Sequence, residues 1–345
     1  MNTFGEQLKL SIFGESHGNG IGIVIDGLPP GLAVDEAFIA SEMARRAPGN
    51  SRLATPRKEP DQVEIMSGVF NGCTTGAPIC GLIRNTNTRS KDYTPEFPRP
   101  GHADLTAHIK YHGFQDYRGG GHFSGRLTAP LVFAGALCKS LLEQNGISVT
   151  GTIIQIGSVT GNGLTAAMED EILRAKADGD SVGGIIECTA SKLPVGLGSP
   201  FFGSVESRLS SMLFSIPAVK GVEFGDGFDL AKMRGSVAND AIIRSAEGAV
   251  APDYATRTNH NGGINGGITN GMDVIFRVAI KPTPSISKPQ DTVNLTTGEP
   301  TLLQITGRHD PCIVPRAVCV VEAAAAIVLT DLLLCQWPDG VRKDR

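Results

Sequence analysis

The chain has 345 residues, of which 43 are glycine and 41 % are hydrophobic. A chain of this length forms one large domain or two, and it buries about three quarters of its unfolded surface. Thirty-one Lys and Arg residues against 35 Asp and Glu give a net charge of −4, which argues against a general nucleic-acid binder. Seven cysteines without a Cys-x-x-Cys pair indicate the reduced thiols of a cytoplasmic protein rather than a disulfide framework.

Neither end of the chain predicts a membrane segment. Residues 1–18 contain charged side chains and lack the apolar stretch of a secretion signal. The most apolar segment, residues 312–337, is interrupted by Arg316, Glu322 and Asp331. Its uncharged runs are far shorter than the roughly 20 residues that a membrane span requires, so we expect a buried helix.

Hydrophobic periodicity and turn residues predict a mixture of strands and helices. The expected strands are residues 21–26, 63–67, 79–83, 147–159, 183–190 and 272–280. The expected helices are residues 35–46, 127–144 and 166–178, a helix capped by Ser204, and a helix after Pro311. Because the strands are short and are separated by long loops, an α+β fold is favoured over a regular βαβ array. Four long polar segments, residues 45–61, 85–104, 254–271 and 281–310, are typical of functional or disordered loops.

His17 lies between Gly14 and Gly18 in the first glycine-rich turn. This pattern predicts a turn that exposes the imidazole and brings backbone close to a ligand, although a glycine hinge with a surface histidine fits equally well. Gly14, Ser16 and Gly18 have the spacing of a nucleophile elbow, but the strand-to-helix context is missing. A hydrolase is therefore disfavoured.

Two further acid–base candidates precede helices. His102 lies in the turn of residues 99–104, where a proton donor can be held rigidly, and Asp310 lies just before the last helix. Asp310 is either the cap of that helix or an oriented proton acceptor. His108 and His112 are one helical turn apart, as in some metal sites, but no acidic residue or cysteine pair joins them at a matching spacing. Ordinary helix-surface histidines are the preferred interpretation.

Arginines concentrate in the irregular loops, among them Arg46 and Arg52. Arginines in glycine-rich loops of a mildly acidic protein indicate sites for planar anions, such as the groups of a small phosphorylated substrate. Residues 119–121 are three consecutive glycines before the helix expected at 127, a position that exposes backbone N–H groups to an anion. The pattern matches neither a P-loop nor a dinucleotide fingerprint.

The order of these motifs resembles the chorismate synthase family over essentially the whole chain. The matching blocks are residues 14–18, 26–31, 45–52, 99–104, 118–121, 218–225, 259–264, 281–286 and 307–312. The resemblance implies a single domain spanning residues 1–345, with helices sandwiched between antiparallel β-sheets, and a cytoplasmic homotetramer. It also implies an anti-1,4-elimination of phosphate from 5-enolpyruvylshikimate 3-phosphate that yields chorismate. The reaction needs reduced FMN without net redox change, and NADPH is a candidate reductant of the flavin.

The resemblance also assigns roles to individual residues. It places His17 beside the reduced flavin, makes His102 the proton donor to the departing phosphate, and makes Asp310 the acid that draws the proton from flavin N5. The arginines matched to phosphate, nucleotide or substrate sites are Arg46, Arg52 and Arg126. The residues matched to flavin-contacting positions are His122, Phe123, Ser124, Pro217, Ala218, Gly266, Lys281, Pro282, Thr283, Pro284, Ser285 and Arg308. No metal site is implied.

One block departs from the family pattern Gly-Gly-Gly-Arg-Ser-Ser-Ala-Arg-Glu-Thr. This chain has His122, Phe123 and Leu127 where the family has Arg, Ser and Glu. A guanidinium offers an anion two parallel hydrogen bonds, whereas a neutral imidazole offers one donor. Restoring Arg and Ser should therefore tighten ligand binding, unless the block has been repacked as a unit. Two other functions stay open at this point: a flavin or phospho-metabolite binder without catalysis, and a histidine-based metalloenzyme.

Overall fold

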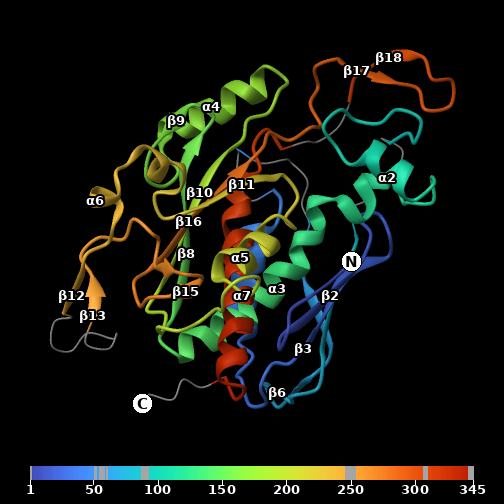
Figure 1. The fold of residues 1–345 in the computed structure, drawn as a ribbon. Helices are drawn as coiled ribbons and strands as arrows, with labels where there is room; N and C mark the ends of the chain where they lie inside the picture. The colour runs from blue at the N-terminus through green and yellow to red at the C-terminus, as the bar shows by residue number, and fades with distance from the viewer. Residues whose placement is uncertain are drawn as a thin grey trace.

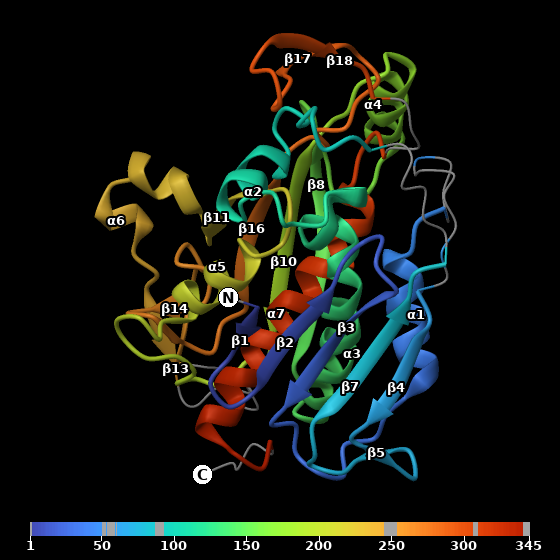
Figure 2. The same cartoon turned by 90° about the vertical axis from the view of Figure 1, so that its right-hand side faces the viewer.

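Two five-stranded antiparallel sheets enclose a layer of helices (Figures 1 and 2). The computed structural model describes residues 2–49, 53, 59, 61–86, 93–244, 254–305 and 310–340. The first sheet has the strand order β1 (Thr3–Phe4), β2 (Lys9–Gly14), β3 (Gly20–Asp26), β7 (Ile79–Arg84) and β4 (Val63–Ser67). The second has the order β11 (Val219–Phe224), β16 (Val274–Ile280), β10 (Gly184–Ser191), β8 (Ser148–Ile156) and β9 (Val159–Thr160). The predicted α+β sandwich is confirmed.

Four helices pack between or beside the sheets, and the remaining elements lie at the periphery. The inner helices are α1 (Glu36–Arg46), α3 (Thr128–Gln144), α5 (Val205–Leu213) and α7 (Val314–Gln336). The outer helical segments are α2 (Asp104–Lys110), α4 (Ala166–Ala177), α6 (Gly235–Ala238), η2 (Arg118–Phe123), η3 (Gly125–Leu127) and η4 (Gly227–Lys232). Small hairpins pair β5 (Val69–Phe70) with β6 (Cys73–Thr74), β12 (Ile242–Arg244) with β13 (Tyr254–Thr256), β14 (Ile264–Asn265) with β15 (Ile268–Thr269), and β17 (Gln290–Val293) with β18 (Pro300–Leu303).

Helices α3 and α7 form the centre of the core. A Cβ atom at Gly135 of α3 would lie 2.3 Å from the Cβ of Ala323 in α7, so only glycine permits this close crossing. Both helices are long and apolar enough to span a membrane, but 83 % and 89 % of their most apolar windows are buried inside the protein. The buried helix expected for residues 312–337 is confirmed.

Two buried carboxylates of α7 tie neighbouring elements to the core. Glu322 accepts hydrogen bonds from Lys139 Nζ at 2.6 Å, Arg45 Nη1 at 2.6 Å and the backbone N–H of Gly151 at 2.9 Å. Asp331, whose side chain is fully buried, accepts from the backbone N–H groups of residues 6–8 and from Arg208. Each carboxylate is thus paired and hydrogen-bonded, which is the condition for keeping a charge inside a core.

The boundaries differ from the sequence prediction at a few turns. The strand expected at 147–159 is divided into β8 and β9, because Gly157 takes the left-handed conformation with φ of +56°. The helix expected from 127 begins at Thr128, and Leu127 ends the short helical turn η3. Ser204 caps α5 as predicted, since its side chain accepts a hydrogen bond from the Ser207 backbone N–H.

Candidate active site

A cavity of about 650 Å³ opens where the loops after several elements converge. Its walls are the C-terminal end of α1, the turn at 99–103, the glycine-rich segment 119–126, the loop 214–220, the loop 281–285 and the start of α7. The volume lies within the usual range for small-molecule sites. Most of the residues that the sequence singled out face this one space.

The cavity is cationic although the protein as a whole is acidic. Its charged lining consists of Arg46, Arg99, Arg126, Lys220, Lys281 and Arg316 against Glu59 and Asp310. Burial, and next the positive charge of Lys220, lower the pKa of Lys281. Such crowding of positive charge favours a ligand with several anionic groups.

Two of the arginines are held by one buried carboxylate. Asp61 accepts from Arg46 Nη2 at 2.8 Å and from Arg126 Nη1 at 2.7 Å, and its side chain is fully buried. Burial lowers the pKa of both arginines, and the nearby charge of Asp61 opposes that shift. Since guanidinium pKa values start near 12.5, both remain charged. Arg52, matched to the same role, lies outside the described residues.

His102 is presented by a tight turn, as the sequence predicts. Gly101 has φ of +71°, and the backbone N–H of His102 donates to Arg99 O at 3.2 Å. The imidazole Nδ1 lies 2.6 Å from Asp104 Oδ1. Arg99 Nη2 lies 3.0 Å from Nδ1 and 3.3 Å from Nε2 of the same ring. The histidine therefore belongs to a charged cluster at the cavity wall.

His17 is buried, so the prediction of an exposed imidazole is wrong. The residue is 8 % exposed, and its ring meets the Tyr93 ring edge-on with centroids 5.5 Å apart. A Cβ atom at Gly119 would lie 2.5 Å from His17 Cδ2 and Nε2. His17 thus lies directly behind Gly119, which lines the cavity. The chain that folds over the histidine is about 100 residues away in sequence, and its local pattern gave no sign of this.

The three consecutive glycines do not form the N-terminus of the long helix. Gly119, Gly120 and Gly121 all have positive φ (61°, 82° and 53°) and precede the start of α3 at Thr128 by seven residues or more. A Cβ atom at Gly120 would lie 3.2 Å from His102 Nε2, as one at Gly119 would meet His17. The glycines instead let one backbone segment contact both candidate acid–base histidines.

Asp310 lines the cavity and does not cap the last helix. Helix α7 begins at Val314 with Ile313 as its N-cap residue, so Asp310 is three residues too early to act as the cap. Arg316 Nη2 lies 3.4 Å from Asp310 Oδ2, and the carboxylate side chain is 11 % exposed. The helix-cap alternative is therefore wrong, and the proton-acceptor interpretation remains.

The residues matched to flavin contacts fall into three groups. The cavity is lined by His122, Phe123, Ser124, Pro217, Ala218, Lys281, Thr283, Pro284 and Ser285. Pro282 does not line it, Gly266 occupies the exposed β14–β15 turn, and Arg308 lies outside the described residues. Among the residues that the structure describes, none forms a hydrogen bond with the buried hydroxyl of Thr283. A bound ligand with polar atoms would satisfy that hydroxyl.

Residues 122 and 123, which differ from the family pattern, contact neighbouring segments of the chain. His122 Nδ1 donates to the carbonyl of Gly14 at 2.8 Å, and Nε2 lies 3.2 Å from Asn2 Oδ1. The Phe123 ring packs against Tyr111 with centroids 6.1 Å apart. Since both ring nitrogens of His122 already contact protein atoms, the structure favours the alternative that this block was repacked as a unit.

The histidines that suggested a metal site do not share a helix face. Helix α2 ends at Lys110, and His112 lies beyond it with φ of +54°. Within the part of the chain that the structure describes, no three His, Cys, Asp or Glu side chains are grouped so as to hold a metal ion.

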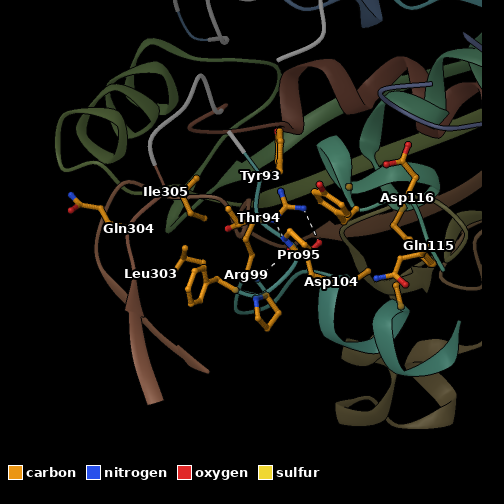
Figure 3. Close-up of a pocket in the computed structure, with 17 residues that line it drawn as sticks. Tyr93, Thr94, Pro95, Arg99, Asp104, Gln115, Asp116, Leu303, Gln304 and Ile305 are labelled. Atoms are coloured by element: carbon orange, nitrogen blue, oxygen red, sulfur yellow. Dashed lines mark hydrogen bonds and ion pairs between the residues drawn. The ribbon is translucent and has the colours of Figure 1, made fainter. Parts of the chain in front are cut away.

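Several site residues were missed by reasoning from sequence. Asp61, Tyr93, Lys220 and Arg316 received no role, and Asp104 was quoted only as part of a motif. A smaller cavity of about 140 Å³ adjoins the first, shares Tyr93 and Arg99 with it, and is also lined by Asp104 (Figure 3). The one usable signal was the Arg-Pro-Gly-His-Ala-Asp sequence, in which an acid follows the histidine by two residues.

Comparisons with known proteins agree with the resemblance. A family model described as chorismate synthase matches residues 8–334. A chorismate synthase of Chitinophaga pinensis is 51 % identical, with 97 % of each chain covered, and one of Thermococcus kodakarensis is 47 % identical, with 98 % and 99 % covered. A solved structure titled "Crystal Structure of Chorismate Synthase" superposes with a TM-score of 0.75 at 32 % identity, covering 96 % of this chain and 93 % of the other.

Proposed function

The chain belongs to the chorismate synthase family, and we propose that the 650 Å³ cavity is the active site in which it carries out the family's reaction. Its activity is that of a phosphate-eliminating lyase in the shikimate pathway. The observation that supports this location best is that His102, Asp310 and a set of arginines and lysines line one cavity. A binder without catalysis would not need a proton donor and a proton acceptor beside the anion site.

The substrate is proposed to be 5-enolpyruvylshikimate 3-phosphate, which carries a phosphate and two carboxylates. These groups match a cavity lined by six cationic side chains and only two acidic ones. Arg46 and Arg126 keep fixed positions because Asp61 binds both, so they do not lose side-chain entropy when an anion arrives. The anti-1,4-elimination then breaks the bond from carbon to the phosphate oxygen and removes a hydrogen from C6.

The family requires a reduced flavin, and we propose reduced FMN as the cofactor of this chain. The cavity fits such a group in three respects: its volume, its cationic lining, and the unpartnered buried hydroxyl of Thr283. Ser124, Ala218 and residues 281–285 are the proposed flavin contacts. When bound, reduced FMN supplies electron density that helps the phosphate to leave and a ring nitrogen that takes up the C6 hydrogen. NADPH is the proposed reductant.

Three side chains are proposed to handle protons. His102 donates a proton from its imidazole to the departing phosphate, since it lies on the cavity wall within the cationic cluster. A carboxylate oxygen of Asp310 accepts the proton that is released at the end of the elimination. The imidazole of His17 is buried behind Gly119, where bulk water has little access, and it retains its proton there.

We also propose that the chain acts as a single domain in a cytoplasmic homotetramer. One continuous cluster of buried residues extends across both sheets and the helix layer, which supports a single domain. The segment with η4, α6, β12 and β13 stands at the edge of the molecule (Figure 1) and exposes Phe228, Val237, Ile242 and Tyr254. Exposed apolar groups of this kind are typical of protein contacts. All seven cysteines are free thiols, in keeping with a reducing compartment.

An anaerobic assay with 5-enolpyruvylshikimate 3-phosphate and photoreduced FMN tests the proposal. We expect phosphate and chorismate in equal amounts, and no product with oxidised FMN in the absence of a reductant. Turnover with oxidised flavin alone would refute the cofactor assignment. Flavin binding without product would favour a binder that lost catalysis, and loss of activity after exhaustive EDTA treatment would favour a metalloenzyme.

A further inference from the structure

The carboxylate of Asp104 is surrounded by the groups that form the wall of the cavity. Arg99 donates to it three times: from its backbone N at 3.1 Å and its Nε at 2.7 Å to Oδ2, and from its Nη2 at 2.9 Å to Oδ1. The fourth contact comes from His102, whose Nδ1 lies 2.6 Å from Oδ1. Figure 3 shows Arg99 and Asp104 directed toward one another at the smaller cavity.

Asp104 stays ionised in this setting. Burial by itself raises the pKa of Asp104, but hydrogen bonds from Arg99 and His102 outweigh burial and hold the pKa well below its usual range. An ionised carboxylate only accepts hydrogen bonds. The proton of the short contact to His102 must therefore reside on Nδ1. In the neutral imidazole this leaves the lone pair on Nε2, which lies 3.3 Å from Arg99 Nη2.

The surroundings of His102 Nε2 leave room for this atom to act as the proton donor. Gly120 contributes no side chain beside it, and an added Cβ would lie 3.2 Å away. The charged groups near the ring are Arg99 and Asp104 from its own turn, and Lys281, whose Nζ donates to the neighbouring carbonyl of Gly101. Asp104 supplies the negative charge among them, so it is the group that stabilises an imidazolium against two nearby cations.

We propose that Asp104 is a positioning residue for His102, fixing the proton on Nδ1 so that Nε2 is the atom that delivers a proton into the cavity. In this step His102 starts as an imidazolium that has taken up a proton from solvent on Nε2. The Nε2–H bond breaks, its electron pair remains on Nε2, and an O–H bond forms on the departing phosphate, which leaves the neutral ring with its proton on Nδ1. Asp104 keeps its negative charge throughout. The inference rests on the proposed role of His102 as proton donor.

The alternative interpretation is that Asp104 has a structural role alone and stabilises helix α2. It is the first residue of α2, where an acidic side chain interacts favourably with the positive end of the helix. That role would affect folding, but it would not depend on the presence of the His102 imidazole. A double-substitution cycle separates the two interpretations.

The experiment measures kcat and KM for Asp104→Asn, His102→Gln and the double variant. We expect Asp104→Asn to lower kcat between about tenfold and 10⁴-fold with little change in KM, because the amide cannot enforce the same tautomer. In the His102→Gln background the same substitution should lower kcat by less than about twofold. Asp331→Asn is the control, since Asp331 is likewise a carboxylate bound to an arginine and to backbone N–H groups but lies away from the cavity.

A second readout is independent of catalysis. Histidine-selective nitrogen NMR of the flavin-free protein, assigned by comparison with His102→Gln, should show the Nδ1–H form of His102 at alkaline pH. In Asp104→Asn the signals should shift toward a mixture of tautomers, whereas Asp331→Asn should leave them unchanged. If Asp104→Asn does not fold, Asp104→Glu replaces it, because the longer side chain moves the carboxylate out of the 2.6 Å contact.

Two results would overturn the proposal. One is an equal loss of kcat from Asp104→Asn with and without His102, and the other is an Nε2–H tautomer in the unaltered protein. If His102→Gln itself leaves turnover intact, the assigned role of His102 fails. The NMR result still decides in that case whether Asp104 fixes the tautomer.

Discussion

An alanine at Gly119, on the cavity wall, should disturb catalysis mainly through its clash with the His17 ring. The backbone at this position has φ of +61°, and a Cβ atom would lie 2.5 Å from two atoms of the His17 ring and 3.0 Å from Ser16 Oγ. Placing alanine in a left-handed conformation costs roughly 1–2 kcal/mol. Overpacking a buried contact adds about 1–3 kcal/mol. Because His17 is only 8 % exposed, the ring has little room to move without displacing its neighbours.

We therefore expect Gly119→Ala to lower the free energy of unfolding by about 2–5 kcal/mol and the melting temperature by several degrees. Turnover should fall about tenfold to a hundredfold, as expected when an acid–base group is displaced by roughly 1 Å. Gly125→Ala is the matched control, since Gly125 lines the same cavity but has nothing within 4 Å of an added Cβ and no positive φ. Scanning calorimetry and the anaerobic assay are run on both variants. Equal behaviour of the two, or wild-type turnover in a destabilised Gly119→Ala, would refute the reasoning.

Three further variants, one of them a double substitution, test other parts of the site and fold. Asp310→Ala should lower turnover by about 10²–10⁴-fold, while the melting temperature falls only by the effect of losing the ion pair with Arg316, because Asp310 caps no helix; a large thermal shift with intact turnover would contradict this. His122→Arg combined with Phe123→Ser should loosen FMN binding in a fluorescence titration, because it removes the contacts to Gly14 and Tyr111; tighter binding would show that the block is not repacked. Burial alone raises the pKa of Asp240, but hydrogen bonds from neighbouring groups lower this pKa to about 2. The ionised Asp240 therefore stabilises the fold at pH values above the usual pKa of an aspartate, and this stabilisation is lost as the pH falls toward 2. Urea unfolding at several pH values should show Asp240→Asn less stable than the wild type near neutrality, with a difference that disappears in strong acid; a constant difference would exclude this linkage.

Elements fixed by neighbouring residues were predictable from the sequence. Ser204 caps α5 as expected, because an N-cap side chain binds an N–H group only two or three residues later. The helix after Pro311 also followed from a predominantly apolar composition that charged residues interrupt. In each case the interactions that define the element lie within a few residues of one another.

Sheet topology was not predictable by the same reasoning. Strand β16 lies between β10 and β11. Arg277 on β16 pairs with Glu187 on β10, and the two residues are 90 positions apart in the chain. Alternating apolar residues identify each strand, but they do not state which strand pairs with which. Family resemblance implied two antiparallel sheets around a helix layer, whereas the order of the strands within each sheet was not predicted and could not have been derived from periodicity.

Burial of the site residues was the main failure of sequence reasoning. His17 was expected in an exposed turn, yet Gly119 and Tyr93 from distant segments cover it. Arg46 was expected to face an anion directly, and no pattern around either residue indicated that Asp61 would bind it. Glycines and acids near histidines show which chemistry is present, but only the folded chain shows which groups meet.

The placement of these acids explains how a protein with a net charge of −4 builds a cationic cavity. Asp61 and Asp104 bind Arg46, Arg126 and Arg99, yet neither acid lines the large cavity that those arginines face. Burying an unpaired guanidinium would be costly, and a carboxylate outside the cavity offsets that cost. Among the described residues, the guanidinium groups of Arg46, Arg126 and Arg99 are already hydrogen-bonded to protein atoms, so they act on an anion chiefly through their positive charge. Because six cationic side chains line the cavity against Glu59 and Asp310 alone, the phosphate and carboxylates of the substrate meet a net positive field there.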